Sequence, residues 1–173
     1  MNRNRIVAVT VMSLITCHLS LITSCSSINC PVENTVAMHY AILNSDGTEG
    51  QPVDTLWVWT QRSDGTDTLV LNSLTGTSTF SLPVSYSHPE DVLVFYMADR
   101  LGIKTLDTVW IKKDDIPHFE SVDCAAHFFH HITDVRCTHE GIDSIVINNR
   151  TVDYNSSVTH LNIYFTPSGI NEN

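Results

Sequence analysis

Histidines give this sequence its one concentration of side chains with metal-binding or acid–base chemistry. Eight histidines follow residue 24, and five of them fall within residues 118–139. On a helix, His127, His130 and His131 would share one face, whereas on a strand only His127 and His131 would do so. Together with a further histidine of this range, such a set could bind zinc or copper.

The same histidines also fit a structural interpretation, because they flank Phe128 and Phe129, whose rings suit a protein core. The sequence contains no His-Glu-x-x-His pair, and no histidine stands at a fixed spacing from a carboxylate. We therefore predict surface histidines between His118 and His139 and no cofactor, with a metal site in this range as the alternative.

Cysteine is the second reactive residue type. Besides Cys25, the chain after residue 24 contains Cys30, Cys124 and Cys137, which allow one disulfide and one free thiol. A Cys124–Cys137 bridge closes a small loop, whereas a Cys30–Cys124 bridge closes a long one. The chain-entropy model gives about 3 kcal/mol for the first and about 4–5 kcal/mol for the second, which does not decide between them. No CxxC spacing is present, which disfavours zinc binding by these thiols.

A short pattern of Asp, a hydroxyl residue and a branched aliphatic residue occurs four times. It begins at Asp54, Asp67, Asp107 and Asp143. The pattern suits the start of a strand after a turn. It also resembles the O-glycosylation sequon of exported proteins of Bacteroidota, which would make the modified hydroxyls Thr55, Thr68, Thr108 and Ser144.

Motifs for other chemistries are missing from the sequence: it has no nucleophile elbow, phosphate loop or dinucleotide fingerprint. Several aromatic residues could form a platform for a sugar, but they stand in apolar runs, which favours core packing. They are Trp57, Trp59, Phe95, Tyr96 and Trp110. We therefore predict that the protein is not an enzyme.

The elements that must position these residues are strands, because apolar residues alternate with polar ones nearly everywhere after residue 35. The clearest strand is 161–165, whereas 56–59 and 92–97 are apolar on both faces and suit central strands. We interpret 112–115, Lys-Lys-Asp-Asp, as a solvated turn, and 125–132 as an irregular segment with one helical turn or a bulge. About eight to ten short strands predict an all-β protein, a two-sheet antiparallel β-sandwich of immunoglobulin-like or transthyretin-like type.

The N-terminal segment is typical of an export signal. Arg3 and Arg5 precede an apolar stretch that is too short and too polar to span a membrane. This stretch ends in residues 21–25, Leu-Ile-Thr-Ser-Cys, which resemble the lipobox of bacterial lipoproteins, where Cys25 would receive the lipid. We predict a signal peptide at 1–24, a lipidated tether at 25–34, one domain at 35–167 and a tail at 168–173.

The charge of the mature chain limits its partners. Residues 1–24 carry two of the nine basic residues and none of the nineteen acidic ones, so seven basic residues remain and the net charge becomes -12. Such an acidic protein is a poor ligand for nucleic acid, and it would not dock on anionic lipid through charge.

Several local motifs are similar to those of an uncharacterised lipoprotein family of Bacteroidota, a domain of unknown function. They are Cys30, Asp54 to Leu56, Pro117 to Phe119 before Val122-Asp123-Cys124, Ile142 to Ile145, and Leu161 to Phe165. The resemblance implies an exported, lipid-anchored β domain without known catalytic residues, and it implies a Cys30–Cys124 bridge with Cys137 free.

The expected function is therefore a non-enzymatic binding or structural module, anchored in the cell envelope by the lipid on Cys25. Its partner, a protein or a glycan, is not indicated. In these bacteria an acidic run after the lipid cysteine promotes surface export, and residues 26–29 are uncharged. An outer-membrane lipoprotein facing the periplasm is therefore favoured over one on the cell surface.

Overall fold

The computed structural model of the chain describes residues 36–52, 55–62, 64–98, 102–121, 124 and 126–166. The predicted signal peptide, the tether with Cys25 and Cys30, and the tail lie outside the described residues. No helix among the described residues is long and apolar enough to cross a membrane.

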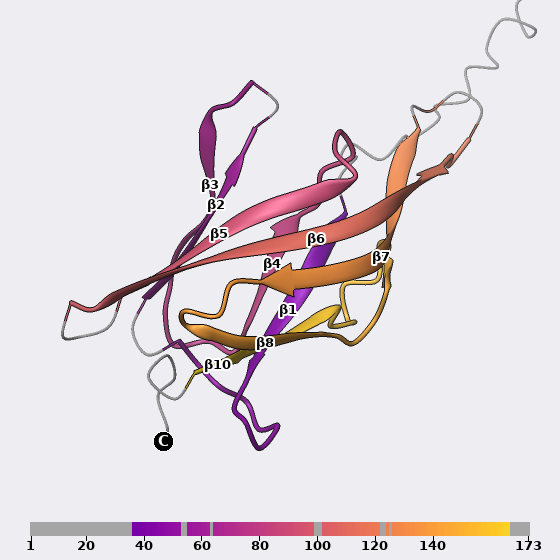
Figure 1. The fold of residues 1–173 in the computed structure, drawn as a ribbon. Coiled ribbons are helices and arrows are strands. Elements are labelled where there is room, and N and C mark those ends of the chain that lie inside the picture. The colour runs from indigo at the N-terminus through magenta and orange to yellow at the C-terminus, as the bar shows by residue number, and fades with distance from the viewer. Residues whose placement is uncertain are drawn as a thin grey trace, which may run out of the picture.

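The described residues form ten strands in two sheets (Figure 1). The strands are β1 (Ala37–Leu43), β2 (Thr55–Gln61), β3 (Asp67–Leu74), β4 (Thr79–Pro83), β5 (Glu90–Ala98), β6 (Lys104–His118), β7 (His127–Cys137), β8 (Ile142–Ile147), β9 (Thr151–Val152) and β10 (Leu161–Phe165). The smaller sheet has the order β4-β1-β10-β8, and the larger one has the order β3-β2-β5-β6-β7-β9.

This architecture confirms the predicted all-β sandwich, with one departure from a fully antiparallel arrangement. The strand β1 pairs in parallel with β10, in the register Tyr40 to Leu161 and Ile42 to Ile163. All other strand pairs are antiparallel. The first and last strands of the described chain therefore lie side by side at the centre of the smaller sheet.

The core lies between the two sheets and follows the alternation in the sequence. Leu161, Ile163 and Phe165 of β10 are buried, as the period of two predicts. Rings connect the two layers: Phe80 of β4 contacts Phe95 of β5 edge to face at 6.3 Å between ring centroids. Such aromatic pairs contribute about 0.5–1.5 kcal/mol beyond the area that they bury.

The strand β6 is longer than its sequence suggests, and the predicted turn at 112–115 is wrong. The strand continues through these residues to His118 and pairs with β7 along them. The alternation of Val109 and Ile111 carries on into Lys113, which therefore points to the core side and is buried. A charged residue on that face is tolerated because partners from β5 and β6 meet it there.

The prediction of an irregular segment at 125–132 is also wrong from residue 127 onward, because β7 begins at His127. Its residues pair one by one with β6, from His118 opposite His127 to Asp114 opposite His131. The β-bulge of this hairpin comes later, where Lys112 pairs with Asp134 and Lys113 with Ile132. A regular strand was hard to recognise because residues on both of its faces are aromatic or apolar.

A buried carboxylate fixes the turn between β7 and β8. Asp107 of β6 is fully buried and accepts four hydrogen bonds. Its donors are the Thr138 hydroxyl at 2.8 Å and the backbone N–H groups of Glu140, Gly141 and Ile142 at 2.9, 2.7 and 2.9 Å. A Cβ on Gly141 would lie 2.5 Å from Cε of Met97 and 2.9 Å from Oγ1 of Thr105, so a larger residue would need both of these side chains to shift.

A buried histidine connects the two sheets. His160 precedes β10 and is fully buried. Its Nδ1 accepts a hydrogen bond from the His39 backbone N–H at 2.9 Å, and its Nε2 donates to the Thr151 carbonyl at 3.0 Å. Burial, followed by the nearby His39, lowers the pKa of His160, which agrees with a neutral ring that both accepts and donates.

Candidate functional site

The described part of the chain contains a pocket of about 680 Å³ where the end of β2 meets the start of β5 in the larger sheet. One wall comes from the end of β2 and its turn, with Thr60, Gln61 and Arg62. The other wall comes from the segment between β4 and β5 and the start of β5, including Ser85, His88 and Asp91. The pocket is of the size that small ligands use.

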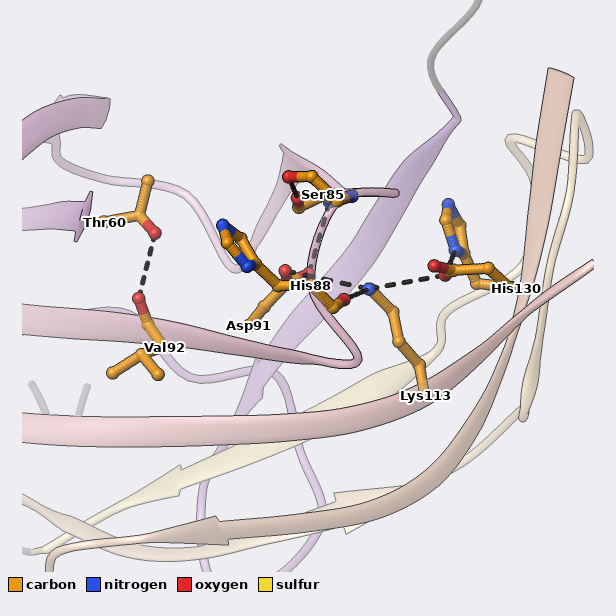
Figure 2. A network of polar contacts seen from close by, with 9 residues as sticks. Thr60, Ser85, His88, Asp91, Val92, Lys113 and His130 are labelled. Atoms are coloured by element: carbon orange, nitrogen blue, oxygen red, sulfur yellow. Dashed lines mark hydrogen bonds and ion pairs between the residues drawn. The ribbon is translucent and has the colours of Figure 1, made fainter. Parts of the chain in front are cut away.

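Beneath this pocket lies a buried lysine. The side chain of Lys113 is not exposed, and its Nζ donates to the His88 carbonyl at 2.6 Å and to Asp115 Oδ1 at 3.4 Å. The same Nζ forms an ion pair with Asp91 Oδ1 at 3.8 Å. Figure 2 shows Lys113 reaching from β6 toward the segment that carries His88 and Asp91. The lysine thus fixes the floor of the pocket.

The network continues away from the pocket to a histidine. Asp115 and His130 are opposite each other in the β6–β7 register, and Asp115 Oδ1 lies 2.6 Å from His130 Nδ1. Burial lowers the pKa of His130, although the Asp115 carboxylate acts in the opposite direction. A neutral ring then donates its Nδ1–H to Asp115, which orients the carboxylate toward Lys113.

Asp91 is the member of this network that lines the pocket. Burial raises its pKa to about 6, and nearby Lys113 only partly offsets that effect. Its contacts are long: the Ser85 backbone N–H donates to it at 3.4 Å and the Lys113 Nζ stands at 3.8 Å. The site therefore presents a desolvated carboxylate with remaining capacity to accept hydrogen bonds from a ligand.

The sequence of the domain matches the model of a known protein family. Residues 55–165 match the DUF6452 model, described as a family of unknown function. The chain belongs to this family. No curated protein and no solved structure matches the chain.

The matched range begins at the first residue of β2 and ends at the last residue of β10. The DUF6452 domain thus includes the whole larger sheet and the candidate pocket, whereas β1 precedes it in the chain and completes the smaller sheet. The resemblance to a domain of unknown function is confirmed; the lipoprotein character and the bacterial group stay predictions.

The histidines predicted as metal ligands do not form a metal-binding group. Because residues 127–131 are a strand, His127 and His131 share one face and His130 points to the other, where it bonds Asp115. His127 is buried edge-on to Tyr154, and His131 is exposed. No group of three or more His, Cys, Asp or Glu residues in the described part of the DUF6452 chain is arranged to hold a metal.

The aromatic residues divide between two faces, and the prediction that they pack in the core holds only for Phe95. That ring is fully buried, whereas Trp59 is 38% exposed on the outer face of the larger sheet. The physical reason is that the smaller sheet covers only one face of the DUF6452 sheet. On the other face the rings cover one another or lie under basic side chains. The Arg136 guanidinium, for example, lies over the Trp110 ring, 4.4 Å from its centroid.

The structure bears on the remaining predicted residues only in part. Cys137 is a free thiol, which removes the Cys124–Cys137 pairing; the Cys30–Cys124 bridge stays a prediction because Cys30 lies outside the described residues. The four hydroxyls predicted as glycosylation sites, Thr55, Thr68, Thr108 and Ser144, are half-buried within strands. Their modification also stays a prediction.

Sequence reasoning missed the pocket and the network. Asp91, Asp115 and Lys113 come from β5 and β6 and meet only through the β5–β6 register and the segment before β5. A signal did exist: Lys113 continues the apolar alternation of Val109 and Ile111, so a charged residue stands where a core residue is expected.

Proposed function

We propose that this protein is a lipid-anchored binding module of the cell envelope that receives a small ligand with an amino group in the pocket above Asp91. The contact geometry of Asp91 carries this proposal. The carboxylate borders the pocket, and its existing partners stand at 3.4 and 3.8 Å, longer than good hydrogen bonds to a charged group. A ligand ammonium group would supply the close partner.

The energetics of Asp91 support a functional role. Its pKa of about 6 in the folded chain, against 3.8 for an unperturbed group, means that the ionised form costs about 3 kcal/mol at neutral pH. Because the folded pKa is the higher one, stability rises as the pH falls through 6 and reaches its limit below 3.8. A group that destabilises the fold at neutral pH is typical of a binding site.

We further propose that the module is not an enzyme. Of the four charged or titratable groups of the network, Asp91 alone lines the pocket, whereas Lys113, Asp115 and His130 lie behind it. These three groups bond one another or the backbone, which suits a rigid support for Asp91 better than proton exchange with a substrate.

The anchor in this proposal is the lipid on Cys25, and it rests on the lipobox-like residues 21–25 and the basic, apolar segment before them. Two or three acyl chains on one cysteine hold a protein stably at a bilayer. The uncharged residues 26–29 favour the periplasmic side of the outer membrane.

The pocket is tested by titrating the Cys25→Ala chain with putrescine and following its backbone N–H signals by nuclear magnetic resonance. We expect shifts at Ser85 and Asp91, and no shifts with diacetylated putrescine, which has no charge. Asp91 has a pKa of about 6, and only its ionised form attracts an ammonium group. The affinity for putrescine should therefore fall about tenfold between pH 7.5 and pH 5.

The matched variants are Asp91→Asn, which should abolish these shifts, and Asp67→Asn, which should not. Asp67 is an exposed aspartate that lines a neighbouring hollow rather than this pocket. Equal loss in both variants, or equal shifts with the diacetylated compound, would contradict the ligand assignment.

The anchor is tested by expressing the full chain in a lipoprotein-processing bacterium and floating the membranes on a density gradient. The wild-type protein should float with the membranes, and Cys25→Ala should stay in the soluble fraction. Mass spectrometry of the N-terminal peptide should find acyl chains on Cys25 of the wild type. An unmodified Cys25 in a correctly exported chain would refute lipidation.

A further inference from the structure

Large apolar side chains gather, exposed, at one end of the domain. Four of them are Tyr86, Ile116, Phe119 and Tyr154, with exposed fractions of 59%, 47%, 63% and 47%. Ile116 lies near the end of β6, and Phe119 follows that strand directly. We call this group the hairpin-end cluster.

Ring contacts attach the two tyrosines of the cluster to opposite faces of the β6–β7 hairpin. Tyr86 stacks on Phe128 of β7 at 5.4 Å between ring centroids. On the opposite face, Tyr154 meets Phe129 edge to face at 4.9 Å, and His118 stacks on Phe129 at 4.3 Å. The result is a wedge of aromatic side chains whose tyrosine hydroxyls can remain in contact with water.

The N-terminal segment joins the domain at this same end. The first described residue, Val36, accepts a hydrogen bond from the Val84 N–H through its carbonyl. Val84 stands two residues before Tyr86, whose ring stacks on Phe128, the partner of Pro117 in the β6–β7 register. A tether that arrives at Val36 therefore arrives beside the hairpin-end cluster.

The length of the tether decides which end of the domain can reach the membrane. Eleven residue steps separate Cys25 from Val36, which span at most about 40 Å when fully extended. The opposite end of the domain begins with Ile103, before β6, and β6 runs the length of the molecule (Figure 1). The fourteen residue steps from Ile103 to Pro117 extend for about 46 Å as a strand. The fully extended tether is thus shorter than the distance along β6, which disfavours an orientation with the Ile103 end facing the bilayer.

We infer that the hairpin-end cluster docks on the surface of the bilayer in which Cys25 is anchored. This inference rests on the lipid anchor proposed above. The partner is a zwitterionic lipid surface, because the mature chain has a net charge of -12 and would be repelled by anionic lipid. Exposed Phe and Ile side chains enter the interface, and tyrosines suit the headgroup level.

Docking orients the module as well as holding it. With the hairpin end of β6 at the membrane and the Ile103 end away from it, the long strands of the larger sheet stand at a steep angle to the bilayer. The pocket at Asp91 stands near the membrane end of β5, since Asp91 pairs with Ile111 of β6.

The test uses the mature lipidated protein in phosphatidylcholine vesicles with brominated or ordinary acyl chains. Phe119→Trp reports on the cluster, and Ile103→Trp, at a residue that is 60% exposed, is the matched control at the other end. After subtraction of the wild-type emission, brominated lipid should quench the added emission of Phe119→Trp and leave that of Ile103→Trp unchanged. Tyr86→Trp provides a second reporter that does not depend on position 119.

Different experimental results would overturn the lipid anchor and the docking of the hairpin-end cluster. The same three variants carrying Cys25→Ala and an N-terminal histidine tag, bound to a nickel-chelating lipid, report on docking even if the native chain lacks its lipid. Loss of flotation by the untagged native chain would overturn the anchor alone. Equal quenching, or no quenching, at positions 119 and 103 on the tagged chain would overturn the docking. Dimers formed through the cluster in the absence of vesicles, with position 119 unquenched in their presence, would also overturn it and assign the cluster to a second copy of the chain.

Discussion

Replacement of Asp107 by alanine is expected to lower the free energy of unfolding by about 4 kcal/mol, the sum of several lost hydrogen bonds to a charged group. The carboxylate is fully buried and accepts bonds from Thr138, Glu140, Gly141 and Ile142. Alanine leaves the N–H groups of Gly141 and Ile142 without an acceptor in a place that water does not reach. Urea unfolding of the purified domain measures the loss.

Asparagine at the same position keeps the shape of the aspartate side chain but removes its charge. Its amide oxygen can still accept from Gly141 and Ile142, while its amino group donates to the Thr138 hydroxyl and leaves the Glu140 N–H without its acceptor, so we expect a smaller loss of about 2 kcal/mol. Asp134→Ala is the matched control, because Asp134 is exposed on β7 and surface changes stay within about 0.5 kcal/mol. A similar small effect for Asp107→Ala and Asp134→Ala would show that the turn is held by other contacts.

Replacement of Lys113 by methionine is the second large expected effect. Methionine keeps the length of the side chain but removes the cation from between Asp91 and Asp115, which leaves two partly buried carboxylates without their counter-charge. Removal of one member of a buried ion pair costs about 3–5 kcal/mol. We expect this loss at pH 8, measured by urea or thermal unfolding.

The loss should depend on pH with a definite sign. Lys113 lowers the pKa of Asp91, so its removal raises that pKa further above 6. Below the raised pKa, Asp91 is protonated in the folded variant and its charge no longer needs a partner. The deficit of Lys113→Met relative to the wild type should therefore shrink from pH 8 to pH 5.

Two further variants make the interpretation specific. Lys113→Met with Asp91→Asn should recover part of the loss, because the two residues share one interaction. Lys112→Met changes the exposed neighbour of Lys113 and should have almost no effect. A loss for Lys112→Met as large as that for Lys113→Met would indicate a general effect of charge rather than the buried network.

The fold class could be predicted because alternation is a local property. Residues 161–165 alternate between buried and half-buried positions along β10, as the sequence indicates. Periodicity does not report which strands become neighbours, however. The parallel pairing of β1 with β10 depends on residues such as Tyr40 and Leu161 that are far apart in the sequence, and no local pattern specifies it.

The candidate site could not be predicted for the same reason. Asp115 and His130 are fifteen residues apart and meet because the β6–β7 register places them opposite each other. The sequence 112–115 has the composition of a solvated turn, and only the three-dimensional structure shows that Lys113 is buried with two carboxylates beside its ammonium group. The aromatic residues of β2 and β5 present a related difficulty, since an apolar run does not indicate whether a second layer covers both faces.

The parallel pair of β1 and β10 has a consequence for how this protein is made. The central pair of the smaller sheet joins residue 40 to residue 161, so that sheet cannot close until almost the whole chain has left the ribosome. Contacts of such long sequence separation slow folding, because the chain entropy is lost before the contacts form. A nascent chain therefore stays open until its last strand emerges, and the central pair of the smaller sheet then joins its two ends.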